Sequence, residues 1–221
     1  MDMVKKISFG IISAVLFLII MTFTEQILQP NYLVKSLIKL SITALIFITY
    51  CSIFKQNLKE AVFFRKMKPA KNLYLCMIIV FIGILTIFFL IRNYLDLPSI
   101  RQNLISKEQL TKQNCLFVFA YIAIVNSFLE ETFFRGFLAH CFEKKSGILF
   151  SALMFSIYHL GIIDSWLNPA ILIFCMIGLF FAGIFLQIIC NHFDSVKASW
   201  IVHGSANLAI NTIGVILIFF Y

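Results

Sequence analysis

The 221-residue sequence has little charge and little proline. Only 13% of its residues are Asp, Glu, Lys or Arg, and it contains four prolines. Hydrophobic residues make up 61%, and the mean hydropathy is +0.96. A soluble domain needs a charged surface, so this shortage excludes one and predicts a polytopic helical membrane protein.

Two further absences narrow the function. The six cysteines form no CxxC pair and no regular framework, so we expect buried free thiols. The net charge is +8, but no basic-aromatic groove motif accompanies it, so we expect no binding to nucleic acid. We assign the Lys and Arg residues to membrane topology instead. The sequence shows no internal repeat, low-complexity tract or soluble domain.

Seven apolar runs separated by polar connections predict seven transmembrane helices. We expect them at about residues 7–23, 33–54, 72–91, 115–142, 147–163, 169–190 and 198–220. Lys35 and Lys39 lie near the start of the second run, where their amines are expected to snorkel toward the interface. We divide the one membrane domain into three N-terminal spans with their connections, 1–114, and a four-span catalytic core, 115–221.

The basic residues predict the orientation of these spans. The connection 55–71 holds six Lys or Arg residues against one acid, Glu60. An N-terminus inside places eleven basic residues on the cytoplasmic side and six outside. The predicted fold class is therefore all-α, a transmembrane bundle of about seven spans with its N-terminus inside. We expect an integral, multi-pass protein, and the Lys-, Ile- and Phe-rich composition is compatible with a bacterial cell membrane.

The fourth run carries three full charges, Glu130, Glu131 and Arg135, where a membrane span is expected. Charges within a span are rare and usually functional. Glu131 and Arg135 are four residues apart and can pair on one helical face, which suggests structural support. Glu130 is rotated by about 100° onto the face of Asn126, away from that partner. Glu130 is therefore the better candidate for catalysis.

Polar side chains on two other spans reach a similar depth. Glu130 and His159 each lie about 18 Å from the cytoplasmic ends of their helices. His203 and Asn207 share one helical face and lie roughly 9 to 15 Å past Lys197. Each alone could be an interhelical hydrogen-bonding group, but together they are more polar than packing requires. We expect Glu130, His159, His203 and Asn207 to face one cavity open toward the cytoplasm.

Three short motifs follow one another along the chain. They are EExxxR at Glu130, Glu131 and Arg135, FxxxH at Phe155 and His159, and HxxxN at His203 and Asn207. Together, over about residues 115–210, they resemble the CPBP family of intramembrane proteases. That family includes the CAAX prenyl endopeptidases of the Ras-converting type and bacterial bacteriocin-processing or self-immunity proteins.

The resemblance implies hydrolysis of a peptide bond in a peptide or membrane-protein substrate beside the lipid bilayer. Nothing in the three motifs distinguishes cleavage of prenylated proteins from cleavage of other substrates. A prenylated substrate and a role in peptide processing or bacteriocin self-immunity therefore both stay open.

The candidate residues support a route without a nucleophilic Ser or Cys. Glu130 and His159 would hold and deprotonate a water, while His203 and Asn207 would stabilise the oxyanion. Alternatively, Glu130, His159 and His203 could bind zinc, as the name metalloprotease, often used for the family, implies. We expect no cofactor, because the sequence has no HExxH pair and Asn207 suits an oxyanion better than zinc.

The main non-enzymatic alternative is a transporter or immunity protein whose buried charges bind a ligand, proton or partner peptide. Intramembrane Glu and His also occur in proton relays. Transporters of this kind often use helices broken by Gly or Pro. The four prolines fall at span ends or in connections, which disfavours transport.

Overall fold

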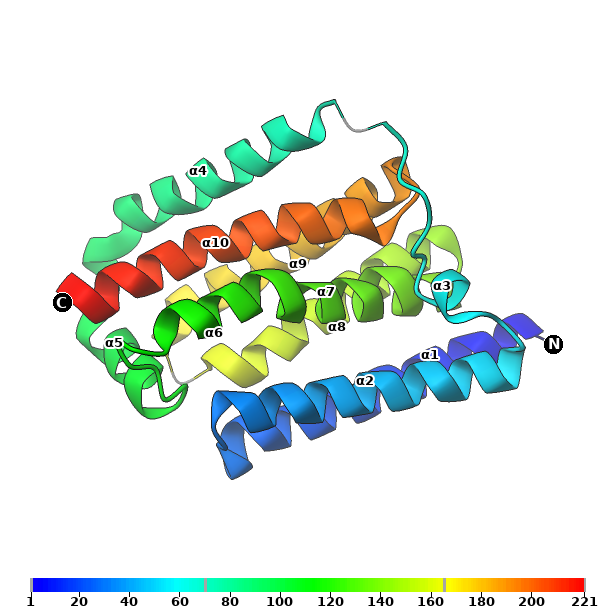
Figure 1. Ribbon diagram of the computed structural model, residues 1–221, viewed down its shortest axis with the longest axis horizontal. Helices are drawn as coiled ribbons and strands as arrows, with labels where there is room; N and C mark the ends of the chain where they lie inside the picture. The colour runs from blue at the N-terminus through cyan, green and yellow to red at the C-terminus, as the bar shows by residue number, and fades with distance from the viewer. Residues whose placement is uncertain (1, 70, 165, 221) are drawn as a thin grey trace.

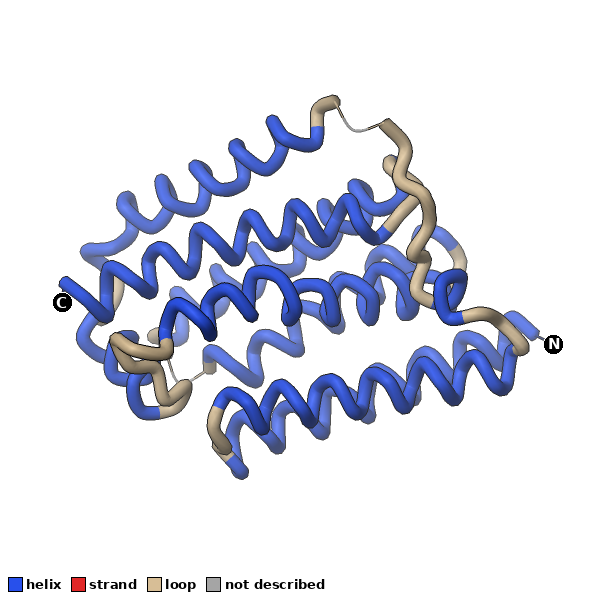
Figure 2. Tube along the Cα trace, in the orientation of Figure 1, coloured by secondary structure: helices blue, strands red, loops and turns tan. Residues whose placement is uncertain are grey.

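The computed structural model describes residues 2–69, 71–164 and 166–220, and these form helices and connections without a β-strand. Figure 2 shows how little of the chain is loop. Within these described residues, seven helical stretches are long and apolar enough to cross a membrane, which confirms the predicted fold class. They are Met3–Leu28, Tyr32–Phe54, Leu73–Tyr94, Cys115–Cys141, Lys144–Ile163, Pro169–His192 and Val196–Phe220. The orientation with the N-terminus inside stays a prediction.

The helices form one bundle with its two chain ends at opposite ends (Figure 1). The helices α1 (Asp2–Phe23) and α2 (Tyr32–Phe54) form one edge, and α4 (Leu73–Ile91) forms the opposite edge against α10 (Val196–Phe220). Between these edges lie the fourth span and the packed pair α8 (Lys144–Ile163) and α9 (Pro169–His192). The central position of the fourth span places its charges inside the protein and away from lipid.

The fourth span is irregular along its whole length. It runs through α6 (Cys115–Tyr121), the π-helix η3 (Ile122–Asn126), α7 (Ser127–Glu131), the π-helix η4 (Thr132–Phe137) and the 3₁₀-helix η5 (Leu138–Cys141). The short α7, which carries both glutamates, therefore lies between two π-helical segments. Such segments occur frequently at functional sites.

Side chains of α10 donate hydrogen bonds to backbone carbonyls in and just before the π-helix η3. Asn207 donates to the carbonyl of Ile122 over 3.2 Å, and Asn211 donates to that of Phe119 over 2.8 Å. Amide side chains reach across helices in this way because few other partners exist in the membrane. These contacts fix α10, with its HxxxN motif, against the fourth span.

An aromatic core holds α1 and α8 against the fourth span. Phe17 stacks on Phe133 with ring centroids 4.3 Å apart, and Phe134 contacts Phe155 edge-on at 5.4 Å. Gly136 follows in the same segment, where an added Cβ would collide with the carbonyl of Val62. The missing side chain at Gly136 therefore permits the connection that contains Val62 to approach the fourth span closely.

Outside the predicted apolar runs, the described residues form three short helices that the sequence did not predict. These are α3 (Leu58–Ala61), η2 (Arg92–Tyr94) and α5 (Leu97–Ser106). The side chain of Asp96 caps α5 by accepting from the backbone N–H of Ser99, and Pro98 lies in its first turn. Arg101 donates to the carbonyl of Leu217 over 3.1 Å, so α5 lies against the last turns of α10.

Candidate active site

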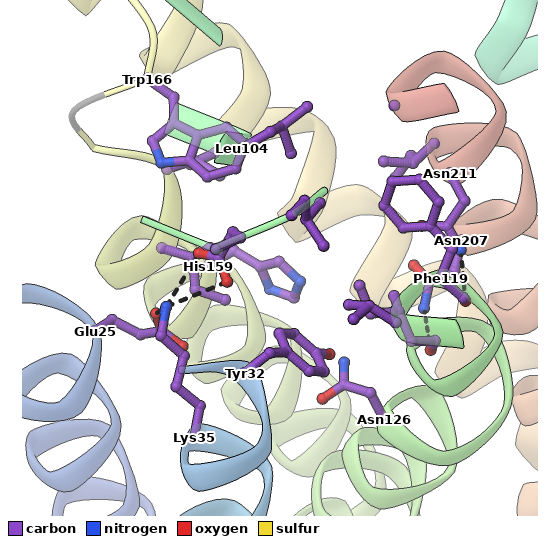
Figure 3. Close-up of a pocket in the computed structure, with 18 of the residues that line it drawn as sticks. Glu25, Tyr32, Lys35, Leu104, Phe119, Asn126, His159, Trp166, Asn207 and Asn211 are labelled. Carbon is purple, nitrogen blue, oxygen red and sulfur yellow. Dashed lines mark hydrogen bonds and ion pairs between the residues drawn. The ribbon is translucent and has the colours of Figure 1, made fainter. Parts of the chain in front are cut away.

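A cavity of about 310 Å³ lies between the helices and contains most of the predicted site. Its polar walls come from α2, the fourth span, α8 and α10, and they include Lys39, Asn126, Glu130, His159 and Asn207. Figure 3 shows His159, Asn126 and Asn207 around this space. The first two spans and the connection before the fourth span therefore build the site together with the fourth, fifth and seventh spans.

The cavity reaches the end of the bundle opposite the N-terminus. Its lining includes Glu25 at the end of the first span, Tyr32 at the start of α2 and Leu104 on α5. With the N-terminus inside, this end lies outside, so the two expectations of an inside N-terminus and a cytoplasmic opening are incompatible. Depth alone cannot decide between the two expectations, because Glu130 lies near the middle of the span Cys115–Cys141 and its depth does not tell which end is open.

The two oxygens of Glu130 have different surroundings. Its side chain is 3% exposed. Oε1 accepts a hydrogen bond from Lys39 Nζ over 2.9 Å and another from Asn126 Nδ2 over 2.8 Å. Oε2 faces Nε2 of His159 at 4.0 Å and Nε2 of His203 at 3.7 Å. One oxygen is thus held by donors, and the other points toward the two imidazoles.

The hydrogen bonds of the histidines determine which ring nitrogen carries the proton. His159 Nδ1 lies 2.8 Å from the carbonyl of Phe155, and His203 Nδ1 lies 2.9 Å from Glu131 Oε1. A carbonyl or carboxylate oxygen only accepts, so we assign the proton to Nδ1 in both rings. In the neutral rings, both Nε2 atoms then present lone pairs toward Glu130.

Glu131 and Arg135 pair as predicted, with 3.6 Å between Glu131 Oε1 and Arg135 Nε, and neither side chain is exposed. The Arg135 guanidinium also lies 4.0 Å from the ring centroid of Phe155. Glu131 does more than pair, because it also orients His203. A carboxylate that fixes a histidine tautomer in this way is a common supporting arrangement.

Three of the four predicted catalytic residues line the cavity, namely Glu130, His159 and Asn207. His203 does not line it and reaches it through Glu130 Oε2. The tautomer also limits the predicted role of His203, because a neutral ring with its proton on Nδ1 has no N–H at Nε2. His203 can donate to an oxyanion only as an imidazolium.

Lys35 and Lys39 were wrongly expected to snorkel to the interface. Both are buried and point inward, with 4% and 5% of their surfaces exposed. Lys35 lies beside Glu25 at the edge of the cavity (Figure 3), with 2.6 Å between Lys35 Nζ and Glu25 Oε2. Lys35 Nζ also lies 3.1 Å from Glu108 Oε1. Burial raises the pKa of the Glu108 carboxyl, while Lys35 opposes that shift.

The contact of Lys39 gives Glu130 a charged partner that the sequence analysis did not identify. Sequence reasoning missed it because the two residues are 91 positions apart. One signal was available, since a buried glutamate in a membrane needs a counter-charge. Lys35 and Lys39, four apart within an apolar run, were the candidates to supply it.

The donor set does not fit zinc well. Among the residues that the structure describes, no group of three or more His, Cys, Asp or Glu side chains is arranged to hold a metal ion. In addition, the Lys39 ammonium lies against Glu130 and would repel a divalent cation. We therefore derive no step through a metal.

Comparison with known proteins confirms the predicted resemblance. A family model described as type II CAAX prenyl endopeptidase Rce1-like matches residues 112–209, close to the expected 115–210. The matched segment contains all three motifs, and the match supports an intramembrane protease. With the seven apolar helices, it also supports an integral, multi-pass membrane protein. No curated protein and no solved structure matches the chain.

Proposed function

We propose that this chain, whose residues 112–209 match the Rce1-like type II CAAX prenyl endopeptidases, hydrolyses a peptide bond with a water activated by Glu130 and His159. One observation carries the proposal. At the cavity, Glu130 Oε2 lies 4.0 Å from His159 Nε2, and both atoms accept hydrogen bonds in the assigned tautomer. Two acceptors at this separation suit one shared water molecule.

A water between these atoms can make a hydrogen bond of about 2.8 Å to each. It would donate one proton to Glu130 Oε2 and the other to His159 Nε2, which leaves an oxygen lone pair for the carbonyl carbon of the substrate. As the new C–O bond forms, Glu130 takes a proton from the water. The same proton then passes to the leaving amine when the C–N bond breaks.

The oxyanion of the tetrahedral intermediate needs donors on the opposite side. Asn207 uses one N–H for the carbonyl of Ile122, which leaves its second N–H for the cavity that it lines. His203, with its proton on Nδ1 facing Glu131, presents only a lone pair at Nε2 and supplies no donor to the oxyanion. Of the two motif residues of α10, Asn207 thus acts as the donor, and His203 lies beside Glu130 Oε2.

The cavity walls beyond the polar groups favour an apolar substrate. They consist mainly of aliphatic and aromatic side chains from α5, α6, η3, α8, the connection after α8, and α10: Ile100, Leu104, Val118, Phe119, Ile122, Ile162, Ile163, Trp166, Ile210, Ile213 and Leu217. We propose a hydrophobic peptide or membrane-protein segment as substrate. A prenylated protein and a bacteriocin-like peptide are the two candidates to compare.

The decisive experiment uses the purified chain in lipid vesicles with prenylated and unmodified peptide libraries. Cleavage by the wild type, reduced ~10²- to 10⁴-fold in Glu130→Gln, is the expected result. Serine- and cysteine-directed inhibitors should leave cleavage intact, and so should exhaustive chelation followed by dialysis. If chelation abolishes cleavage and zinc restores it, the zinc mechanism replaces the one proposed. If no peptide is cleaved and Glu130→Gln instead abolishes uptake of a solute, the chain is a transporter.

A further inference from the structure

Lys39 enters the candidate active site from a helix outside the family match. It lies on α2, within an apolar span, and its side chain is 6% exposed. Nζ donates to Glu130 Oε1 over 2.9 Å and also to Asn126 Oδ1. It lies 4.7 Å from the ring centroid of Tyr158, a distance typical of a cation–π contact.

Lys39, Asn126 and Glu130 form a closed hydrogen-bonded set. Asn126 accepts from Lys39 and donates to the same Glu130 oxygen that Lys39 contacts. Rotation of the carboxylate would break both hydrogen bonds to Oε1. The set therefore keeps Oε2 directed at His159 and His203.

The charges around Glu130 point to a second effect of Lys39. A buried carboxylate without a counter-charge takes up a proton instead of remaining an anion. Arg135 is engaged by Glu131, and the neutral His159, His203 and Tyr158 supply no positive charge. Lys35, one turn away on the same face of α2, is held by Glu25 and Glu108 instead.

We propose that Lys39 is a positioning residue that keeps Glu130 ionised and aims its Oε2 at the reacting water. This inference rests on the proposed function and adds to it. The motifs of residues 112–209 supply the base, and the N-terminal region of the chain supplies the cation that makes it available at neutral pH.

Kinetics in phosphatidylethanolamine–phosphatidylglycerol vesicles test the proposal with a matched control. Lys39→Met should lower kcat at neutral pH by ~10²-fold or more with little change in KM, and kcat should recover as the pH is raised. Lys39→Arg should keep most of kcat, because it restores the charge. Lys6→Met, which removes a lysine of α1 that lies 5.8 Å from the Phe54 ring centroid and does not line the cavity, should stay within a few-fold of the wild type.

An infrared difference spectrum tests the same point without substrate. Lys39→Met minus wild type should show a protonated-carboxyl band at neutral pH, and that band should be missing when Glu130→Gln is added. We call the hydrogen-bonded set of Lys39, Asn126 and Glu130 the clamp. This measurement separates failure of the clamp from failure of the proposed function, because it does not require cleavage. An ionised Glu130 in Lys39→Met, or a wild-type kcat with an unchanged pH profile, would overturn the proposal.

Folding of the variants is checked by size-exclusion chromatography. If Lys39→Met does not fold, Asn126→Ala tests the clamp with the lysine in place, since it removes one of the two donors to Oε1. A lower kcat at unchanged KM is then expected. A wild-type kcat in a folded Asn126→Ala variant would show that the carboxylate needs no such clamp.

Discussion

Replacing Arg135 with alanine should damage folding more than it damages chemistry. The guanidinium is fully buried, lies 3.6 Å from Glu131 and covers the Phe155 ring at 4.0 Å. Arg135→Ala leaves Glu131 as a buried charge without its guanidinium. Breaking a buried pair on one side typically costs ~3–5 kcal/mol. His203 still donates to Glu131, so turnover per folded molecule should fall much less than folded yield.

A second arginine provides the control for this experiment. Arg65 lies 3.5 Å from Asp194, but the two side chains are 51% and 43% exposed. Exposed pairs contribute about 0–1 kcal/mol, so Arg65→Ala should leave folded yield and the thermal midpoint nearly unchanged. Removing both Glu131 and Arg135 should be less harmful to folding than Arg135→Ala alone, since no unpaired charge remains.

The assay is the folded fraction after extraction, measured by size-exclusion chromatography, together with cleavage per folded molecule. Equal losses for Arg135→Ala and Arg65→Ala would refute the argument from burial. Normal folded yield with abolished turnover would refute the structural assignment and make Arg135 a participant in the chemistry.

Two further predictions concern packing and topology. Gly136→Ala should lower the thermal midpoint, because the added Cβ would collide with the carbonyl of Val62. Gly83→Ala is the control and should leave the midpoint unchanged, because a Cβ there would meet no neighbouring atom within 4 Å. An equal effect of both substitutions would contradict the close-approach argument. Single cysteines at the exposed positions Lys66 and Gln109 should report orientation in intact cells. With the N-terminus inside, an impermeant thiol reagent should label position 109 and spare position 66, and the reverse pattern would place the cavity opening in the cytoplasm.

The spans could be predicted closely because transmembrane hydropathy is a local property. Each apolar run carries enough information in about 20 consecutive residues to define a helix. The helix α5 was not predicted, because a hydropathy pattern identifies only helices that span the membrane. It is ten residues long, and neither its length nor its composition suits a membrane span. Its position over the cavity follows from contacts with α10, which are distant in sequence.

The site was predictable to the extent that helical spacing determines it. The four-residue spacing correctly predicted that Glu131 pairs with Arg135. The same spacing predicted that Asn126 lies beside Glu130, and a hydrogen bond joins these two side chains. Helical spacing cannot show which helix lies opposite. The contact of His203 with Glu131 joins residues 72 positions apart, so the structure was needed to find it.

The buried lysines of α2 have a consequence for how the chain enters the membrane. Lys35 can meet Glu25, ten residues before it, as soon as the first two spans form a hairpin. Glu130, the acid that Lys39 contacts, is synthesised 91 residues later. At about 5–20 residues per second, translation needs roughly 5–18 s to reach it. During that time α2 carries an unpaired lysine, and insertion of a lysine at a helix centre costs about 2.5–3.5 kcal/mol. The leucine- and isoleucine-rich remainder of α2 must therefore keep this helix in the bilayer until the fourth span is inserted.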